Sequence, residues 1–546
     1  MIITNCKQST FTTRMNCIPQ RLRYRQTGAF SKIVLDYLDD ADQLRGFYAH
    51  RPTVEGLQQA IEARKGFATN RNVLVEHLHQ QYNAVSLNDA VTKNIELLRR
   101  EHTFTITTAH QPNLFTGPLY FLYKILHAIK LAADCKHQFP QYDFVPVYYM
   151  GSEDADVDEL AHFWLNGEKK EWKTTQSGAF GRFVVDKELV KLIDAMAGEI
   201  GVDPFGNELA TQLKNYYKVG SSIQQATFEL VNDLFAEYGL IVLIADAAEL
   251  KQQMKAVFED ELLQHNSSKL VEQTAKQLEQ YYKVQAGGRE INLFYLDEDI
   301  RERIEAKGEG YTVANTTIEF TKDEIIKELN EHPERFSPNV ILRGLFQETI
   351  LPNIAFIGGG GEIAYWLELK AVFDFYKIPF PALVLRNSFL LIEAKWKAKQ
   401  EKWQLSNEEL FRPSEALLNN LVIKESAEAV KLNGTYTEAE QLYELLRKKS
   451  AAVDATLVPH VEALKTKTLY RLQELEKKLL RAEKRKFTDQ RRQMEQIKKA
   501  LFPNNGLQER IDNFSPYYAK WGRELIHQLY EHSLSLEQEF VVLNIK

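Results

Sequence analysis

The stretch FTITTAHQPNLFTGPLYFLYKILHAIKLAA, from Phe104 to Ala133, changes character twice along its length. Its apolar start predicts a buried strand, and the apolar periodicity after Pro118 predicts an amphipathic helix. A polar loop that contains His110 and Asn113 separates the two. A strand, a loop and a helix in succession form the repeating unit of an α/β fold, so the stretch indicates that fold class.

The same alternation recurs over most of the chain before Phe389. Continuous apolar runs are typical of a parallel sheet that helices cover on both faces. Helical segments such as Glu362–Tyr376 lie between several runs, which favours right-handed crossovers and a doubly wound sheet. The runs that we expect to be buried strands are Phe104–Ala109, Phe144–Met150, Leu240–Asp246, Asn292–Leu296, Ile354–Gly358 and Ala382–Asn387.

Two segments interrupt the alternation, and helix formers dominate after Phe389. Within Leu390–Trp403, Thr437–Ser450 and Ala455–Leu501 we expect helices, and the apolar spacing from Leu472 to Leu501 indicates a coiled-coil seam. The predicted division is a disordered extension at 1–14, a core in three parts at 15–163, 223–280 and 339–389, inserted subdomains at 164–222 and 281–338, a helical coiled-coil domain at 390–506, and a tail that packs back on the body at 507–546.

The composition excludes several classes of protein. Of the 546 residues, 44% are hydrophobic and 26% are charged, which argues against a disordered or fibrous chain. The longest apolar stretch, Leu240–Ala245, is far shorter than the roughly 20 residues that a membrane-spanning helix needs. Three cysteines are too few for a disulfide framework. We therefore expect a cytoplasmic protein without a membrane span.

Charge is unevenly distributed along the chain. The net charge of −7 argues against a general nucleic-acid binder. The segment Val461–Ala500 contains 13 Lys or Arg against 6 Asp or Glu, which gives a local charge of +7 and leaves −14 elsewhere. Such a basic arm could bind a nucleic acid, an anionic cofactor or an acidic partner. A solvated coiled-coil face is the simpler interpretation.

The loop after the first predicted strand combines polar side chains with a helix start. Free N–H groups after Thr116, where we expect a helix to begin at Pro118, favour an anion. His110, at the end of the strand, could stabilise a transferring phosphate or act as an acid or base. A purely structural role for His110 remains the alternative. The candidate site residues in this loop are His110, Gln111, Asn113, Thr116 and Gly117.

The loop after the second strand, MGSEDADVDEL at Met150–Leu160, is acidic. Acidic side chains at a helix start often only cap the helix. Several carboxylates at one strand end can also hold Mg²⁺ or the ammonium group of a substrate. The spacing is not that of an EF-hand, because the middle of the loop has no glycine. Both interpretations stay open for Glu153, Asp154 and Asp156.

A third loop, within IAFIGGGGEIAYW at Ile354–Trp366, contains four consecutive glycines. Glycine lets a ligand approach the backbone. The pattern is neither GxGxxG nor a P-loop, so it supports neither a dinucleotide dehydrogenase nor a Walker-type ATPase. Arginines nearby can bind a phosphate or carboxylate through two donors. The candidate ligand-binding residues here are Gly358, Gly359, Gly360, Gly361, Glu362, Tyr365, Arg343, Gln347, Arg386, Asn387 and Ser388.

At these three loops the sequence resembles a known family. TAHQPNLFTGPLYFLYK is similar to its TGPLY motif, VYYMGSEDADVDE to its acidic EDHD loop, and the segment Asn339–Ser388 to its block around GEIAYW. GLQERIDNFSPYY, near the C-terminus, is similar to its LQER segment. The family is BshC, the cysteine ligase family of bacillithiol biosynthesis. Ala155 stands where the family usually has His, and Gly360 where Pro is common, so no role of that His is transferred.

The resemblance implies a Rossmann-like core with two connecting-peptide subdomains, followed by a helical coiled-coil domain that helps to form a dimer. It also implies the last step of bacillithiol biosynthesis, the addition of cysteine to glucosaminyl-malate. The family's core is similar to that of nucleotidyltransferases that adenylate carboxylates. The expected cofactor is therefore ATP, with Mg²⁺ as a candidate metal, and the expected partners are cysteine, glucosaminyl-malate and an adenine nucleotide.

Such a ligation needs donors around the α-phosphate, an anion-tolerant helix start and a carboxylate that orients the incoming ammonium group. We assign the first two needs to His110, Asn113, Thr116 and the Gly117 backbone, the third to Glu153, Asp154 or Asp156, and the malate carboxylates to Arg343 and Arg386. The alternative is a non-catalytic nucleotide-binding or scaffold protein that acts through its basic coiled coil. The apolar seam predicts a homodimer through the helical domain.

Overall fold

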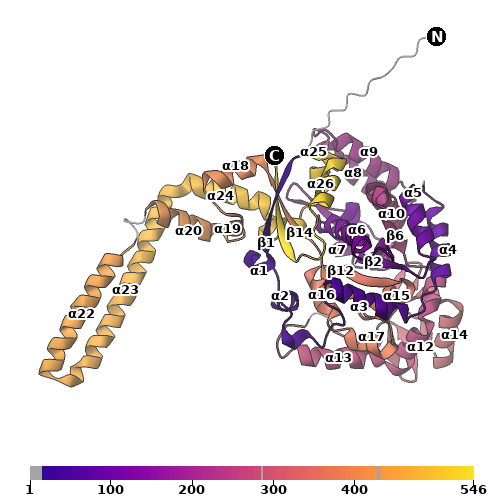
Figure 1. Cartoon of the computed structure of the whole chain (residues 1–546), viewed down its shortest axis with the longest axis horizontal. Helices are drawn as coiled ribbons and strands as arrows, with labels where there is room; N and C mark the ends of the chain where they lie inside the picture. Colours follow the sequence, from indigo (N-terminus) through magenta and orange to yellow (C-terminus); the bar gives the residue numbers. More distant parts are fainter. Residues whose placement is uncertain (1–14, 86, 285–286, 427–430) are drawn as a thin grey trace, which may run out of the picture. The chain divides into compact units, whose positions relative to one another are not determined.

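The computed structural model describes residues 15–85, 87–284, 287–426 and 431–546 (Figure 1). The extension expected at residues 1–14 lies outside them. The chain forms two compact units, one of Met1–Ile392 with Gly506–Lys546 and the other of Glu393–Asn505. No helix in the described ranges has both the length and the apolar character that crossing a membrane requires.

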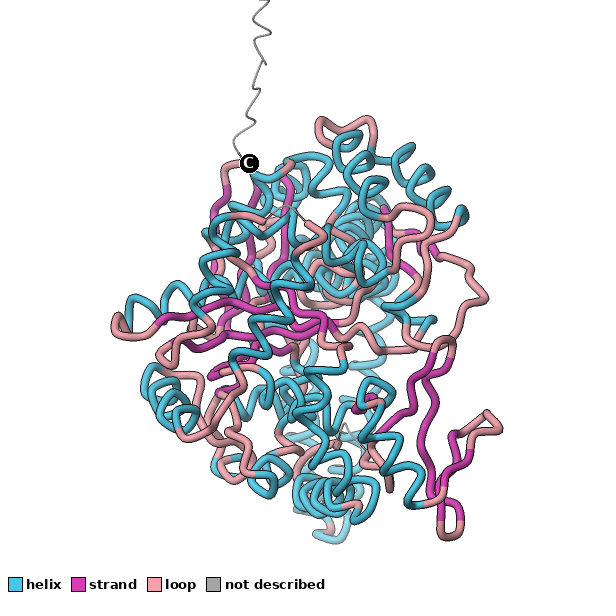
Figure 2. The backbone as a smooth tube through the Cα atoms, turned by 90° about the vertical axis from the view of Figure 1, so that its right-hand side faces the viewer, coloured by secondary structure: helices cyan, strands magenta, loops and turns pink. Residues whose placement is uncertain are grey.

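The centre of the first unit is a five-stranded parallel sheet, whose strands lie side by side among helices (Figure 2). Its strands are β2 (Thr103–His110), β3 (Asp143–Met150), β6 (Ile241–Ile244), β12 (Asn353–Gly358) and β13 (Ala382–Leu385). They lie in the order β13-β12-β2-β3-β6, and neighbouring strands are parallel. The first strand is central and the chain winds outward on either side of it, which is the order of a Rossmann sheet. The predicted fold class is confirmed.

One predicted strand belongs to a different sheet. Asn292–Leu296 forms β7 (Leu293–Asp297), which lies in an antiparallel sheet of order β10-β9-β8-β7-β11. Leu293, Tyr295 and Leu296 are buried while Phe294 and Asp297 are only half-buried, so the strand is not fully buried. A run this short does not distinguish that case from a fully buried strand. The other strands are β8 (Ile300–Lys307), β9 (Gly310–Val313), β10 (Glu319–Phe320) and β11 (Phe336–Pro338).

Helices α3 (Val54–Lys65) and α6 (Tyr120–Gln138) pack on the parallel sheet through one apolar cluster. Leu57 and Ile61 of α3 and Leu131 of α6 meet strand residues such as Ile106 there. The helix predicted at Glu362–Tyr376 is two helices, α16 (Gly360–Trp366) and α17 (Lys370–Tyr376). Further helices of this unit are α1 (Tyr24–Thr27), α2 (Lys32–Leu38), α4 (Arg71–Tyr82), α5 (Asp89–Leu97), α7 (Val157–Leu160), α10 (Ile223–Phe235), α11 (Ala248–Lys251), α12 (Lys255–Gln264), α13 (Asn266–Leu278), α15 (Val340–Ile350), α25 (Ser515–Trp521) and α26 (Arg523–Glu531).

Three further features complete the first unit. The segment 164–222 contains part of the hairpin β4 (His162–Leu165) and β5 (Glu168–Glu171), and helices α8 (Lys187–Ile200) and α9 (Gly206–Tyr216). The segment 281–338 contains the antiparallel sheet and α14 (Lys322–Glu331). Strand β15 (Glu539–Ile545) pairs with β1 (Cys17–Arg23) and β14 (Ser388–Glu393), so the tail joins the beginning of the described chain.

The second unit is helical. The predicted helix Leu390–Trp403 is wrong at its start, because β14 occupies residues up to Glu393 and α18 (Ala394–Lys402) follows. The predicted helix Ala455–Leu501 is interrupted by a 3-10 turn at Arg485–Phe487, within its apolar seam. The helices are α19 (Asn407–Leu410), α20 (Ser414–Glu425), α22 (Asn433–Val453), α23 (Val458–Lys484) and α24 (Thr488–Leu501).

Candidate active site

A cavity of about 610 Å³ opens at the carboxyl ends of the parallel strands. His110 ends β2, Met150 ends β3, Asp246 follows β6 and Gly359 follows β12, and all four residues line the cavity. Strands β2 and β12 are neighbours at the point where the strand order reverses. Doubly wound sheets bind their ligands at this switch point, so the fold places the cavity where a ligand site is expected.

The cavity brings together residues from all three predicted loops. The predicted site residues that line it are His110, Gln111, Glu153, Asp154, Arg343, Gly359, Gly360, Gly361, Glu362, Tyr365 and Arg386. The predicted site residues that lie outside its lining are Asn113, Thr116, Gly117, Asp156, Gln347, Gly358, Asn387 and Ser388. The three loops therefore converge on the cavity, but the second group of predicted residues lies outside its lining.

C-terminal residues cover the turn that precedes helix α6, while Tyr120, the first residue of the helix, lines the cavity. The Leu119 N–H donates to the Asp512 carbonyl at 2.8 Å, and the Asn513 side-chain amide donates to the Gly117 carbonyl at 2.6 Å. Helix α6 begins at Tyr120, two residues later than predicted. These contacts do not support the predicted anion site at the helix start, because the Leu119 N–H already has a partner within the chain.

Asn113 and Thr116 are buried beside that turn. Their exposed fractions are 4% and 0%, and the Asn113 side-chain amide donates only a long bond of 3.4 Å to the Glu159 carbonyl. The backbone of Gly117 has φ +63°, an angle that residues other than glycine rarely adopt. A Cβ at this position would lie 2.9 Å from Asn113 Cβ. These three residues shape the loop from inside the protein, so a direct role in binding phosphate does not fit their positions.

His110 contacts two aromatic rings at the cavity wall. The Tyr120 hydroxyl lies 3.4 Å from His110 Nε2, and the His110 ring packs edge-on against the Tyr120 ring and at a tilt against the Phe121 ring. Burial holds the pKa of His110 well below its ordinary value, and the positive charges of Lys124, Arg343 and Arg386 lower it further. The imidazole is therefore neutral near pH 7, in the form that can accept a proton.

Lys124 links the first loop to the glycine-rich turn. Its ammonium group is buried and donates to the Ala109 carbonyl and, at 2.6 Å, to Glu362 Oε2. The same carboxylate oxygen accepts the Gly359 N–H at 2.8 Å. Gly359 has φ −72°, and a Cβ there would make only ordinary contacts of 3.4 and 3.6 Å. The turn is therefore held by Glu362 and Lys124 and does not depend on a left-handed conformation.

Asp154, like Glu159 of the same loop, lines the cavity without an ion-pair partner among the residues that the structure describes. It accepts a hydrogen bond of 3.1 Å from the Gln111 side-chain amide. Burial alone would raise the pKa of Asp154, but the charge of Arg301, the Gln111 hydrogen bond and the charge of Arg343 lower it overall. An ionised carboxylate in this position can receive an ammonium group.

The neighbouring carboxylates have other partners. Glu153 forms an ion pair with Lys251, and burial nevertheless raises the pKa of Glu153 above its ordinary value. Asp156 accepts the Glu159 N–H at 3.1 Å and thereby caps α7. Of the three carboxylates that the sequence left as alternatives, the structure therefore favours Asp154.

Arg343 and Arg301 line the cavity, and neither is ion-paired to a carboxylate within the described ranges. Arg343, on α15, donates to the Tyr365 hydroxyl at 3.3 Å. Arg301, on β8, lies 4.0 Å over the Phe294 ring and donates to the Ser337 hydroxyl at 3.4 Å. Half-buried guanidinium groups without a carboxylate partner are suited to bind a carboxylate or phosphate of a ligand.

Arg386 also lines the cavity, but its charge is already balanced. It donates to Glu509 Oε1 at 2.8 Å and to the Asn387 carbonyl at 2.9 Å, and the Glu509 side chain is 0% exposed. Its guanidinium lies over the Tyr120 ring. The assignment of Arg386 to a malate carboxylate is therefore not supported by its contacts, since Glu509 of the tail occupies that role.

Asn387 and Ser388 belong to the same buried connection with the tail. The Asn387 N–H donates to His127 Nδ1 at 3.1 Å, and its side-chain amide donates to the Leu534 carbonyl at 3.0 Å. Ser388 Oγ accepts from Arg386 at 3.2 Å. Gly358 lies inside β12, where a Cβ would come within 2.9 Å of the Phe356 ring. These residues hold the strand ends in place.

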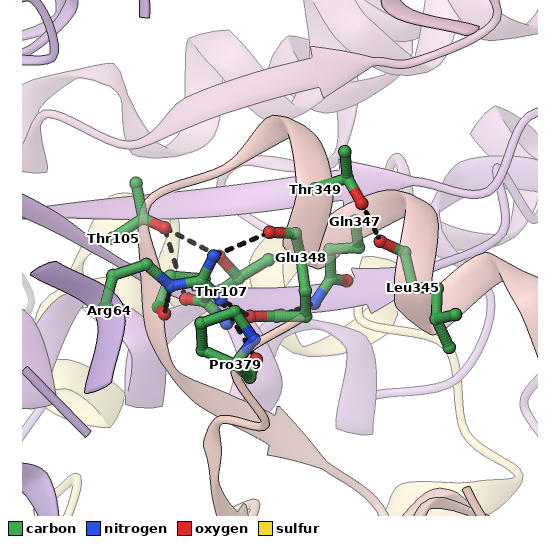
Figure 3. Close-up of polar contacts among 9 residues, drawn as sticks. Arg64, Thr105, Thr107, Leu345, Gln347, Glu348, Thr349 and Pro379 are labelled. Atoms are coloured by element: carbon green, nitrogen blue, oxygen red, sulfur yellow. Dashed lines mark hydrogen bonds and ion pairs between the residues drawn. The ribbon is translucent and has the colours of Figure 1, made fainter. Parts of the chain in front are cut away.

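A second charged cluster lies near the amino ends of β2 and β12 (Figure 3). Arg64 of α3 donates to Glu348 Oε2 at 2.7 Å and to the Asn353 carbonyl at 2.8 Å. Gln347 and Asn353 donate to the other Glu348 oxygen at 2.9 and 2.8 Å. The Arg64 and Glu348 side chains are 1% and 0% exposed. Gln347 thus belongs to this cluster, away from the cavity.

Sequence reasoning missed several residues of the cavity. Arg301 and Arg289 come from the segment 281–338, whose sequence carries no recognisable motif. Asp246 ends a predicted strand, and Arg510 stands in the quoted LQER segment, so both could have been proposed from position alone. Within the described ranges, no group of three or more His, Cys, Asp or Glu side chains is arranged to hold a metal ion.

Comparison with known proteins agrees with the geometry. The family model described as "Bacillithiol biosynthesis BshC, N-terminal Rossmann-like domain" matches residues 15–387, and the model of the family's C-terminal coiled-coil domain matches residues 389–545. The chain belongs to the BshC family. The expected resemblance, the Rossmann-like core and the coiled-coil domain are thereby confirmed.

Relatives in the BshC family are similar over nearly their whole length. A protein of Flavobacterium johnsoniae named "Putative cysteine ligase BshC" is 41% identical, and the alignment covers 96% of this chain and 99% of the relative. Proteins of the same name from Flavobacterium psychrophilum and Christiangramia forsetii are 40% and 38% identical, over 96% and 97% of this chain and 98% of each relative. These names support a ligase of bacillithiol biosynthesis.

Proposed function

We propose that this chain adds cysteine to glucosaminyl-malate in the last step of bacillithiol biosynthesis, with ATP-dependent activation of the carboxylate. The observation that carries the proposal is one cavity, at the switch point of a Rossmann-like sheet. Among the described residues, its lining combines carboxylates and guanidinium groups that form no ion pair, including Asp154, Arg343 and Arg301. An acceptor that bears both an amine and carboxylates needs groups of both signs in one cavity.

The acceptor would lie between the two kinds of charge. Asp154 would hold the amino group of the glucosaminyl unit, while Arg343 and Arg301 would hold the malate carboxylates. Both arginines contribute to lowering the pKa of Asp154, which shows that the three groups act on one another electrostatically. This arrangement orients one ligand by opposite charges at its two ends.

His110 would accept the proton that the attacking amine loses. Burial and, after it, three cations lower the pKa of His110 in the free protein. Carboxylates of a bound acceptor would offset part of that positive charge and raise the pKa of His110 toward its ordinary value, which makes it a better base when substrate is present. The proton would then pass from the ammonium group to a ring nitrogen of His110.

ATP would supply the activation: the cysteine carboxylate would attack the α-phosphate and release pyrophosphate, and AMP would leave from the mixed anhydride when the amine attacks. The feature that fits its phosphates is the Gly359–Gly361 turn, whose backbone lines the cavity. The chain's own contribution would be to bind these groups, orient the amine and receive its proton. Mg²⁺ would enter with the nucleotide.

Gene deletion tests this proposal directly. We expect the deletion strain to lose bacillithiol and to accumulate glucosaminyl-malate, and we expect the wild-type gene to restore both pools. The gene for Arg301→Met should fail to restore them. Arg303→Met serves as the matched control, because Arg303 lies two residues along the same strand and its side chain is 38% exposed beside Glu305. Unchanged pools in the deletion strain would contradict the proposal.

We further propose that the chain forms a homodimer through its helical unit. Helix α22 has no buried residue, and α22 and α23 expose several large apolar side chains. Leu445 and Leu475, for example, are 51% and 46% exposed. A second copy would cover this apolar surface. Light scattering should show a dimer for the wild type and a monomer for the Leu445→Glu/Leu475→Glu variant; a wild-type monomer at micromolar concentration would contradict the proposal.

A further inference from the structure

A buried lysine, Lys251, lies next to the acidic loop of the cavity. Its side chain is 0% exposed, and its ammonium group contacts a carboxylate oxygen of Glu153, Asp246 Oδ1 at 3.1 Å and the Glu334 carbonyl at 2.7 Å. Glu153 follows β3 and Asp246 follows β6, which are adjacent strands of the parallel sheet. One ammonium group therefore connects the loops that follow two neighbouring strands.

The same cluster reaches both segments that interrupt the sheet. Arg182, within 164–222, donates to the two oxygens of Asp246 at 2.8 and 2.9 Å. Glu334 belongs to the 3-10 turn Pro333–Arg335, within 281–338. Lys251 therefore joins the core directly to segment 281–338, and its partner Asp246 joins the core to segment 164–222 through Arg182.

The backbone of the acidic loop is held by the first of these segments. The Phe180 N–H donates to the Asp154 carbonyl at 2.7 Å, and the Gly181 N–H donates to the Ser152 carbonyl at 2.8 Å. Lys251 fixes the Glu153 side chain between these two points. The position of Asp154, the next residue, therefore depends on both sets of contacts.

Charge balance explains why a lysine occupies this place. Glu153 and Asp246 are two carboxylates at adjoining strand ends, and Lys251 and Arg182 neutralise them. Loss of one partner from a buried ionic cluster leaves an uncompensated charge, which is strongly unfavourable. Carboxylates at adjoining strand ends can also hold a divalent cation, and here a fixed ammonium group takes the position of such a cation.

We infer that Lys251 is a positioning residue, which acts through Glu153 to hold the acidic loop so that Asp154 meets the amino group of the acceptor. This inference rests on the proposed ligase function for its catalytic consequence. Its structural part, that Lys251 fixes residues 151–156, does not depend on the reaction.

Steady-state kinetics of Lys251→Met, Lys251→Arg and Lys276→Met test the inference, with glucosaminyl-malate as the varied substrate. We expect Lys251→Met to raise KM for glucosaminyl-malate by about tenfold or more while kcat changes much less, because a group that binds the acceptor is displaced. Lys251→Arg should restore part of the loss. Lys276→Met, which removes an exposed lysine paired with Glu272, should leave both constants unchanged.

Hydrogen exchange provides a readout that does not need turnover. Amides of residues 151–156 should exchange faster in Lys251→Met than in the wild type, and amides within α6 should not. If Lys251→Met does not fold, the Lys251→Met/Glu153→Gln variant keeps the charge balanced and is measured in its place. Wild-type KM together with wild-type exchange in residues 151–156 would overturn the inference. A wild-type protein that forms no product would refute the ligase function, and the exchange data would still decide the role of Lys251.

Discussion

Two charged clusters lie at opposite ends of strands β2 and β12, and they differ in how their charges are paired. At the amino ends, Arg64 and Glu348 form an ion pair and each has additional hydrogen-bond partners (Figure 3). At the carboxyl ends, Arg343 contacts a tyrosine hydroxyl and Asp154 a glutamine amide. The first cluster is complete within the chain, whereas the second has groups of both signs available to a ligand.

The difference shows how to separate charges that hold a fold from charges that serve a site. A buried charge is tolerated when hydrogen bonds and an opposite charge surround it. Arg386 illustrates the point inside the cavity, because Glu509 balances it and so removes it from the set of free anion receptors. The presence of a partner, more than residue type, distinguishes the two classes.

The largest expected effect is a loss of stability at the amino-end cluster of Arg64 and Glu348. Arg64→Met should lower the free energy of unfolding by about 3–5 kcal/mol, because it leaves Glu348 buried without its partner. Chemical denaturation measures the change. Arg25→Met is the control, since the Arg25–Asp39 pair is 62% exposed on both sides and should contribute far less to stability. Equal effects of the two substitutions would contradict the view that the buried Arg64–Glu348 pair holds the fold.

At the carboxyl-end cluster of Arg343 and Asp154 we expect activity to fall and stability to be kept. Arg343→Met should lower the rate of ligation by about 10²–10³-fold, equivalent to roughly 3–4 kcal/mol of barrier, through loss of an anion-binding donor. Its free energy of unfolding should stay the same or rise, because no carboxylate loses a partner. Product formation and denaturation are measured on the same preparation. A destabilised variant with full activity would show that Arg343 is structural.

The free energy of unfolding should depend on pH through the buried hydrogen bonds of His127. Its Nδ1 accepts the Asn387 N–H and its Nε2 donates to the Ser535 carbonyl, and burial, outweighing the Ser535 bond, lowers the pKa of His127 from 6.5 to about 4. The unfolded chain binds the proton first, so this stability is complete above about pH 6.5 and is lost as the pH falls toward 4. Relative to His127→Gln, the wild type should lose roughly 3 kcal/mol over that range. Parallel curves for the two proteins would refute the assignment.

The smallest effect concerns two glycines. Gly117→Ala should cost about 1–2 kcal/mol, since its φ is +63° and a Cβ would press on Asn113. Gly359→Ala should change stability by less than about 0.5 kcal/mol, because its φ is negative and the added Cβ makes ordinary contacts. Thermal unfolding compares them. A larger loss at Gly359 would mean that the turn beside the cavity is strained.

Local patterns in the sequence predicted the parallel strands and the three loops that converge on the cavity. They did not predict which carboxylate or arginine would lack a partner, because the partners are distant in sequence: Glu509 for Arg386, and Lys251 for Glu153. Asn513 likewise covers a turn nearly 400 residues earlier. Arg301 lies in a segment without a motif, so only its place in the folded chain reveals it.

Reconstitution of the reaction tests the central claim most directly. Purified protein is incubated with ATP, cysteine and glucosaminyl-malate, and the mixture is analysed by mass spectrometry for bacillithiol and for the nucleotide product. The account predicts bacillithiol and AMP with the wild type, and neither above background with Arg343→Met. A folded wild-type protein that yields no bacillithiol from these three substrates would contradict it.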